Sequence, residues 1–130
     1  MERFCLIFAS LNGFLAVAFG AFGAHGLKRK LEAMALAPEE SAKILGWVDT
    51  GAHYQLVHAA ALLALAALWP RLNPGPATLA ARGFAWGALI FSLSLYAMAL
   101  GAPRWFGAIT PIGGLGLLVG WASLAWAFSH

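Results

Sequence analysis

Residues 50–69 read TGAHYQLVHAAALLALAALW, a run of 20 residues that has no charged side chain apart from histidine. A helix needs about 20 apolar residues to cross a hydrocarbon core about 30 Å thick. A membrane β-strand needs roughly half that number of residues. Since only helices and closed barrels satisfy their own backbone in lipid, this stretch predicts a transmembrane helix. Trp47 and Trp69 bracket it, about 33 Å apart along a helix, and tryptophan favours both membrane interfaces.

Further runs without Asp, Glu, Lys or Arg cover residues 4–26, 83–100 and 106–128. Trp105 and Trp126 bracket the last of these runs, as Trp47 and Trp69 bracket residues 50–69. A signal peptide is the alternative for residues 4–26, but the apolar run is long for one. The pattern predicts an all-α integral membrane protein in which residues 1–130 form a single domain of four antiparallel transmembrane helices.

The composition excludes several other classes of protein. Hydrophobic residues make up 62% of the chain and charged residues 10%, against roughly 25% charged residues in soluble domains. A soluble globule and a disordered chain are therefore both excluded. The net charge of +3 comes from 8 Lys and Arg without a basic stripe, so no nucleic acid is expected as a partner. The single cysteine, Cys5, cannot form an internal disulfide or a cysteine-based metal site.

Residues 27–49 are the sizeable extramembrane segment. Leu27, Leu31 and Met34 follow helical spacing beside the basic residues 28–30. That pattern predicts a short interfacial helix lying on anionic lipid, and the alternative is a solvated basic stop after the first span.

Prolines and glycines predict the ends of several helices. Pro38 suits the first position of a helix, with acidic residues 39–40 in its first turn. We expect this helix to continue into the second span and to protrude from the bilayer. Residues 73–76, Asn-Pro-Gly-Pro, predict a loop, and residues 101–103 predict a tight turn. Pro111 predicts a kink one turn into the fourth span.

Polar side chains inside a membrane are costly and are candidates for function. Helix direction places a set of them in one leaflet, with little beyond Ser10 and Asn12 in the other. Gly51, Tyr54, Gln55 and His58 share one helical face. We expect this cluster to converge inside the bundle, with His58 neutral and hydrogen-bonded about 12 Å deep. The candidate residues are His25, Tyr54, Gln55, His58, Tyr96 and Thr110.

The cluster allows more than one interpretation. The first is structural, because such side chains hydrogen-bond across helices. The second is a pocket for a lipid, a quinone or another amphipathic molecule. The third is haem or metal ligation by His25 and His58, or proton transfer through them. Residues with metal-ligand spacing are too few for a typical zinc site, so no cofactor is predicted. No nucleophile motif stands out either, so the sequence predicts a non-enzymatic protein.

Glycines at helical spacing predict close helix packing. Small residues spaced in this way let two helices approach each other. The alternative to contacts within one bundle is self-association, with a second copy or another membrane protein as partner. The glycines concerned are Gly13, Gly20, Gly83, Gly87, Gly116 and Gly120.

Several motifs in order resemble one family over nearly the whole chain. They are GAFGAH at residues 20–25, YQLVH at 54–58, FSLSLY at 91–96 and TPIGG at 110–114. The chain resembles the YgdD-like family of small bacterial inner-membrane proteins, whose usual third-span motif has glycine where Leu93 stands. The resemblance implies four helices in a bacterial inner membrane and supplies no activity.

The orientation has two interpretations. Five Lys and Arg residues lie on the first-loop side and three on the side of the termini. This excess of positive charge favours a cytoplasmic first loop. Some members of the family that the chain resembles have basic C-terminal tails, which imply cytoplasmic termini instead.

Overall fold

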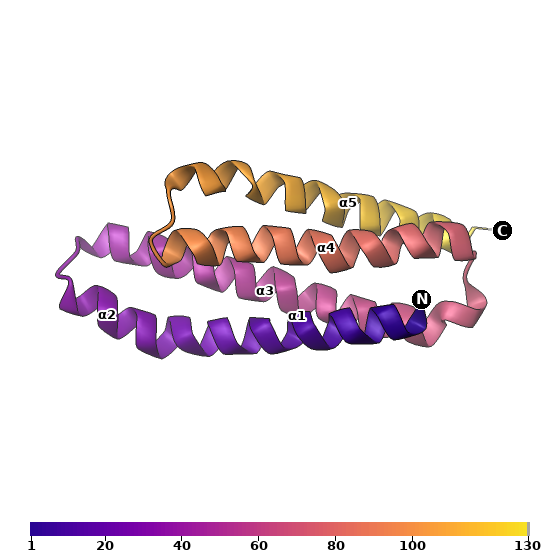
Figure 1. Ribbon diagram of the computed structural model, residues 1–130, viewed down its shortest axis with the longest axis horizontal. Coiled ribbons are helices and arrows are strands. Elements are labelled where there is room, and N and C mark those ends of the chain that lie inside the picture. The colour runs from indigo at the N-terminus through magenta and orange to yellow at the C-terminus, as the bar shows by residue number, and fades with distance from the viewer. Residues whose placement is uncertain (130) are drawn as a thin grey trace.

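The computed structural model describes residues 1–129, and every regular element in them is helical (Figure 1). Four helical stretches are long and apolar enough to cross a membrane, which confirms the predicted all-α membrane fold: Glu2–Ala33, Pro38–Arg71, Pro74–Ala99 and Arg104–Ala127. Their elements are α1 (Glu2–Phe22), η1 (Gly23–Leu27), α2 (Lys28–Ala33), α3 (Pro38–Leu68), η2 (Trp69–Arg71), α4 (Pro74–Ala99), η3 (Arg104–Ala108) and α5 (Thr110–Ala127).

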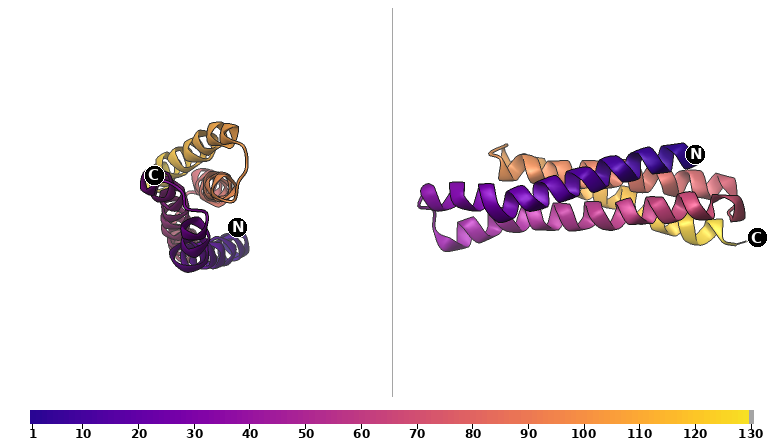
Figure 2. Two further views of the ribbon diagram at one scale, coloured as in Figure 1. Left: turned by 90° about the vertical axis from the view of Figure 1, so that its left-hand side faces the viewer. Right: turned by 90° about the horizontal axis from the view of Figure 1, so that it is seen from below.

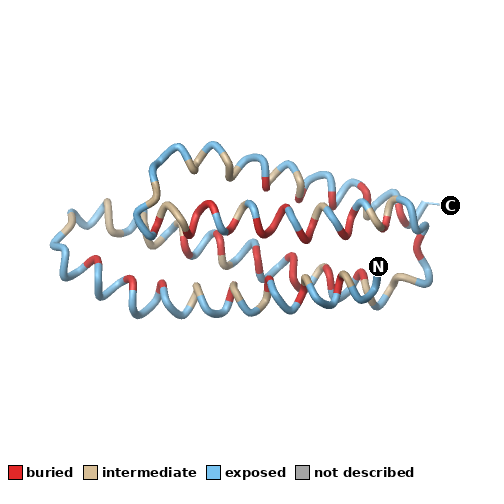
Figure 3. Tube along the Cα trace, in the orientation of Figure 1, coloured by how far each residue is buried: buried red, intermediate tan, exposed pale blue. Residues whose placement is uncertain are grey.

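The helices pack in the order α1, α3, α4, α5, each against the next along the chain. Helix α1 also reaches α4, whereas α5 packs chiefly on α4. Seen from the end of the bundle, α5 lies on the far side of α4 from α1 (Figure 2). Helix α4 is consequently the most deeply buried of the long helices (Figure 3). This arrangement leaves space between α3 and α5 on the surface of α4.

The first long helix does not end before the basic residues 28–30. Helix α1 continues through the π-helical turn η1 into α2, as far as Ala33. Leu27 and Leu31 are buried against α3 and α4, and Met34 alone of the three is exposed. A π-turn bonds i to i+5 and so shifts the helical face. The shift keeps both leucines in the bundle while residues 28–30 stay outside.

Helix α3 begins at Pro38 as the sequence predicts. Its 31 residues span about 46 Å at 1.5 Å per residue, which exceeds a hydrocarbon core about 30 Å thick. Glu40, in the first turn, accepts a hydrogen bond from Arg104 Nη2 over 3.1 Å. This ion pair joins the start of α3 to η3, but both side chains are well exposed, so its contribution is about 1 kcal/mol or less.

Two of the predicted breaks coincide with the first turns of helices. Asn73 caps α4 by accepting from the Gly75 amide over 3.3 Å, and Pro74 and Pro76 occupy its first turn. Pro111 likewise stands in the first turn of α5, directly after the 3-10 turn η3. The first amides of a helix have no intrahelical acceptor, so proline costs nothing there. The tight turn predicted at residues 101–103 is confirmed, with Gly101 at φ +102°.

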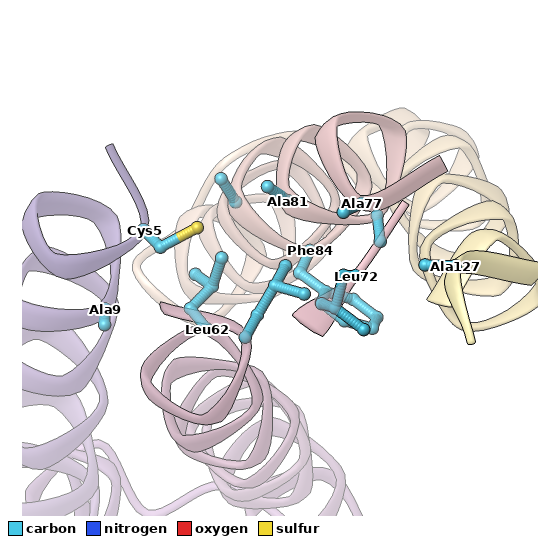
Figure 4. Packing of buried hydrophobic residues seen from close by; sticks show 11 residues of the cluster. Cys5, Ala9, Leu62, Leu72, Ala77, Ala81, Phe84 and Ala127 are labelled. Atoms are coloured by element: carbon cyan, nitrogen blue, oxygen red, sulfur yellow. The ribbon is translucent and has the colours of Figure 1, made fainter. Parts of the chain in front are cut away.

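An apolar core fills the end of the bundle that holds the N-terminus. Cys5 and Ala9 of α1, Leu62 of α3, and Ala81 and Phe84 of α4 meet there (Figure 4). A second apolar cluster joins Leu27, Leu31, Val48, Tyr96 and Ala99 near the other end. Along α1, α3 and α4 the buried polar residues lie between these two clusters. The candidate site is therefore a polar layer held between apolar ones.

Candidate functional site

A chain of hydrogen bonds joins α1, α3 and α4 in the polar layer. The Tyr96 hydroxyl donates to Gln55 Oε1 over 2.8 Å, and Gln55 Nε2 donates to Asn12 Oδ1 over 3.1 Å. Asn12 Nδ2 then donates to the carbonyl of Phe8 in its own helix over 2.9 Å. Asn12, Gln55 and Tyr96 are almost completely buried. The chain therefore ends on a backbone carbonyl and has no exposed end at Asn12.

The ring of Tyr96 has close neighbours on both α1 and α3. It stacks on Phe19 of α1 with the ring centres 4.0 Å apart. Gly51 of α3 gives it room, since a Cβ there would lie 2.7 Å from the ring. One turn earlier on α4, Ser92 Oγ donates to the Gly51 carbonyl over 2.7 Å. Gly51 thus serves two contacts at one crossing of α3 and α4.

His58 makes a separate set of contacts, toward α5. Its Nδ1 lies 2.6 Å from the Tyr54 carbonyl oxygen, and the Trp121 indole Nε1 lies 3.0 Å from its Nε2. An indole N–H can only donate and a carbonyl can only accept. His58 is therefore the neutral tautomer with its proton on Nδ1, as the prediction of a neutral, hydrogen-bonded imidazole requires.

Replacing His58 with leucine should lower the stability of the protein by about 1–3 kcal/mol, because the Trp121 indole loses its acceptor. His58→Gln should recover part of this loss, since its amide oxygen can accept from the indole. The measurement is thermal unfolding in detergent, with His53→Leu as the control because His53 is exposed. Equal melting temperatures for the parent and His58→Leu would show that the contact with Trp121 stabilises nothing.

A groove of about 500 Å³ lies beside His58, between α3 and α5. Phe91 of α4 also contributes to its lining, and Tyr54 and Trp121 stand at its walls, each about half exposed. The rest of the lining is almost entirely apolar: Pro111, Gly114, Leu115, Leu117 and Leu118. A volume of several hundred Å³ with apolar walls and few polar groups is typical of sites for small molecules.

The single polar face predicted on the second span divides into two sets. Gly51 and Gln55 face α1 and α4, whereas Tyr54 and His58 face the groove. Tyr54 does not enter the bundle interior as expected, since 43% of it is exposed. Thr110 lies with neither set, because its hydroxyl pairs with Ser94 Oγ at 2.7 Å.

His25 does not join the cluster, so this part of the prediction is wrong. It lies in η1 and is exposed. Its neighbour Gly23 lies opposite Val48, where a Cβ would be 2.8 Å from the valine side chain. Val48 and His58 are separated by about 15 Å along α3 at 1.5 Å per residue. A site that uses both His25 and His58 has no geometric support.

Asn12 and Trp121 are the residues that the sequence reasoning missed. Helix direction places Asn12 in the opposite leaflet, yet it bonds Gln55. An asparagine inside a span needs a partner, and that requirement could have linked the two amides. Trp121 lies inside a span rather than at its end. A tryptophan there needs an acceptor for its N–H, and His58 supplies it.

The predicted packing glycines of α4 and α5 lie against each other within one chain. A Cβ at Gly83 would lie 2.7 Å from the Gly116 carbonyl, and one at Gly120 would lie 2.6 Å from Phe84. Gly87 faces the Gly113 carbonyl in the same way, at 3.0 Å. Gly13 and Gly20 instead face Ala59 and Ala52 of α3 at ordinary distances of 3.9 and 3.8 Å.

The long apolar helices, the buried polar layer and the glycine-packed crossing define a multi-pass α-helical membrane protein. Residues 19–114 match the family described as "Protein of unknown function (DUF423)". The chain belongs to this family, also named UPF0382, whose members include the inner membrane protein YgdD, and it is itself an inner-membrane protein. No solved structure matches the chain.

Relatives cover almost the whole chain. The UPF0382 membrane protein of Haemophilus influenzae is 44% identical over 126 residues, which is 97% of this chain and 94% of that protein. YgdD of Escherichia coli is 40% identical over 93% of this chain and 86% of its own. YwdK of Bacillus subtilis is 36% identical over 89% and 88%. The family resemblance inferred from the motifs is therefore confirmed.

Proposed function

We propose that the protein is a non-enzymatic binder of an amphipathic molecule, and that the groove between α3 and α5 takes one acyl or isoprenoid chain. The observation that carries this proposal is the groove itself, with about 500 Å³ of space and a nearly apolar lining. It runs from Pro111 to Trp121, about 15 Å along α5. A chain in the surrounding bilayer could enter it sideways, because it lies on the surface of the helices.

Tyr54 gives the groove a polar group for orienting a ligand. Its phenol can donate to an ester or quinone oxygen or accept a hydrogen bond, and the residue is half exposed on the wall. His58 has a different role, since both of its ring nitrogens already have partners. It holds Trp121, which lines the groove. A few placed polar groups in an apolar pocket are typical of specific binding.

The competing functions have weaker support. A metal or haem iron would need a free imidazole nitrogen, and both nitrogens of His58 are engaged in the fold. A proton relay would need groups that titrate, but the buried chain from Tyr96 passes through the amides of Gln55 and Asn12. Amide side chains donate and accept hydrogen bonds without carrying a transferable charge. Binding is therefore the function that the geometry favours.

Filling the groove should weaken chain binding. Leu118 lines it and Val119 does not, although both are exposed on α5. We expect Leu118→Trp to weaken binding of an oleoyl lysophospholipid by about tenfold, which corresponds to about 1.4 kcal/mol. Val119→Trp is the matched control and should bind as the parent does. Titration followed by native mass spectrometry measures both.

The proposal is wrong if the parent binds no single-chain lipid above the level of Leu118→Trp. Equal loss in both tryptophan variants would also contradict it, because the loss would then reflect a disturbed helix and not an occupied groove. Thermal unfolding of both variants checks that each remains folded.

A further inference from the structure

A second hollow lies on the α1 side of α3, away from the groove. It has a volume of about 350 Å³ and lies between α3 and the stretch of helix that includes η1. Gly20, Gly23 and Val48 contribute to its apolar lining, and Lys28 and Asp49 add charged side chains. The volume lies within the range of about 300–1,000 Å³ seen for ligand sites.

The two charges in this hollow are not paired with each other. Among residues 1–129, the ion pair within 4.0 Å joins Arg104 to Glu40, so Lys28 and Asp49 stand further apart than that. Both residues are exposed, yet both line the same space. A hollow with one separated cation and one separated anion is complementary to a ligand that carries both charges, a zwitterion.

The helix is irregular where the hollow forms. Residues 23–27 make a π-helical turn, and π-turns within α-helices are frequent at functional sites. Gly23 brings this turn close to α3, because a Cβ there would lie 2.8 Å from Val48. Lys28 follows the turn directly. The extra residue in the turn changes where the side chains beyond it point, which places the lysine beside the space that Asp49 faces.

The position along the helices indicates a membrane interface. Trp47, a residue type that favours the interface, precedes Val48 and Asp49 on α3. Lys28, Arg29 and Lys30 follow each other on the partner helix, and basic residues at this level attract lipid phosphates. The apolar lining then continues toward the bilayer, where acyl chains would lie.

We propose that this hollow binds the headgroup of a phospholipid with a primary ammonium, of the phosphoethanolamine kind. The Lys28 ammonium would contact the phosphate, and the Asp49 carboxylate would accept hydrogen bonds from the lipid ammonium. A choline headgroup has no N–H to donate to Asp49, and a glycerol headgroup has no positive charge for it. The site is separate from the α3–α5 groove, so its headgroup preference does not depend on chain binding there.

The test uses the full-length protein, freed of lipid in detergent and titrated with three phospholipids of identical acyl chains. The headgroups are phosphoethanolamine, phosphocholine and phosphoglycerol. Native mass spectrometry should give an affinity for the first that is roughly fivefold higher than for the others, the size expected of an exposed charge-assisted contact. Similar affinities for all three in the parent would overturn the proposal.

Variants separate the two charges. Lys28→Gln should weaken the binding of all three lipids, because each has a phosphate. Asp49→Asn should remove only the preference for phosphoethanolamine. Lys43→Gln and Glu39→Gln are the matched controls, since each removes an exposed charge of the same sign from the first turns of α3. A preference that survives Asp49→Asn would contradict the assignment of the carboxylate.

Two further arms identify the source of the ligand. Water-soluble phosphoethanolamine alone should bind far more weakly than the lipid, and equal binding would show a site for a free zwitterion instead. Leu118→Trp should leave the headgroup preference unchanged, because Leu118 lines the other groove. Failure of the groove and failure of this hollow can therefore be told apart.

Discussion

Gly113→Ala should destabilise the protein by about 3 kcal/mol or more, near the upper end of the usual range for overpacking. A Cβ at Gly113 would lie 2.7 Å from Phe91 Cα and 2.8 Å from the Gly87 carbonyl oxygen. These atoms belong to the backbone of α4, so they cannot move aside as a flexible side chain would. The methyl group can be accommodated only if α4 and α5 separate, and α5 packs chiefly on α4.

The next residue supplies the control for this prediction. A Cβ at Gly114 would lie 3.9 Å from the Phe91 ring, which is an ordinary contact. Both substitutions exchange glycine for alanine in the same turn of α5, so helix propensity changes equally in the two. Thermal unfolding in detergent and the fraction of monodisperse protein after purification measure the difference. If Gly113→Ala and Gly114→Ala have the same melting temperature, the close approach of α4 and α5 is wrong.

The number and type of the long helices followed from the sequence because charge-free runs of about 20 residues have few physical alternatives. The end of the first span did not follow. Basic residues 28–30 look like a stop, yet the helix continues with Leu27 and Leu31 buried beneath them. The π-turn at residues 23–27 produces this phase shift. Hydropathy does not detect the turn, because the turn changes the direction in which side chains point and not their polarity.

The sequence predicts only part of the candidate site, because it does not determine how the helices are aligned along their length. Gln55, His58 and Tyr96 were expected in the interior and are buried there. Helix direction gives an approximate depth of each residue in the membrane, but it does not give the shift of one helix along another. It therefore could not place Asn12 or His25. Contacts such as Gly13 with Ala59 and Gly20 with Ala52 determine that register. They bring Asn12 to the level of Gln55 and leave His25 near the end of the bundle.

Gln55→Met should be among the most destabilising substitutions in the polar layer. Methionine keeps the length of the side chain but leaves the Tyr96 hydroxyl without its acceptor and Asn12 Oδ1 without its donor. Each unsatisfied buried group costs about 1–3 kcal/mol, so the sum is about 2–6 kcal/mol. Thermal unfolding measures it, with Ser10→Ala as control, because the exposed Ser10 hydroxyl bonds only the Leu6 carbonyl of its own helix.

Replacing all three members of the chain should then recover most of the lost stability. Asn12→Leu and Tyr96→Phe, added to Gln55→Met, remove the groups left unpaired and keep the ring that stacks on Phe19. Interhelical hydrogen bonds in membranes average about 0.6 kcal/mol when measured with both partners removed. Two such bonds predict that the triple variant lies only about 1 kcal/mol below the parent. A triple variant no more stable than Gln55→Met would show that the amides hold the register of α1, α3 and α4 in a way that apolar contacts cannot replace.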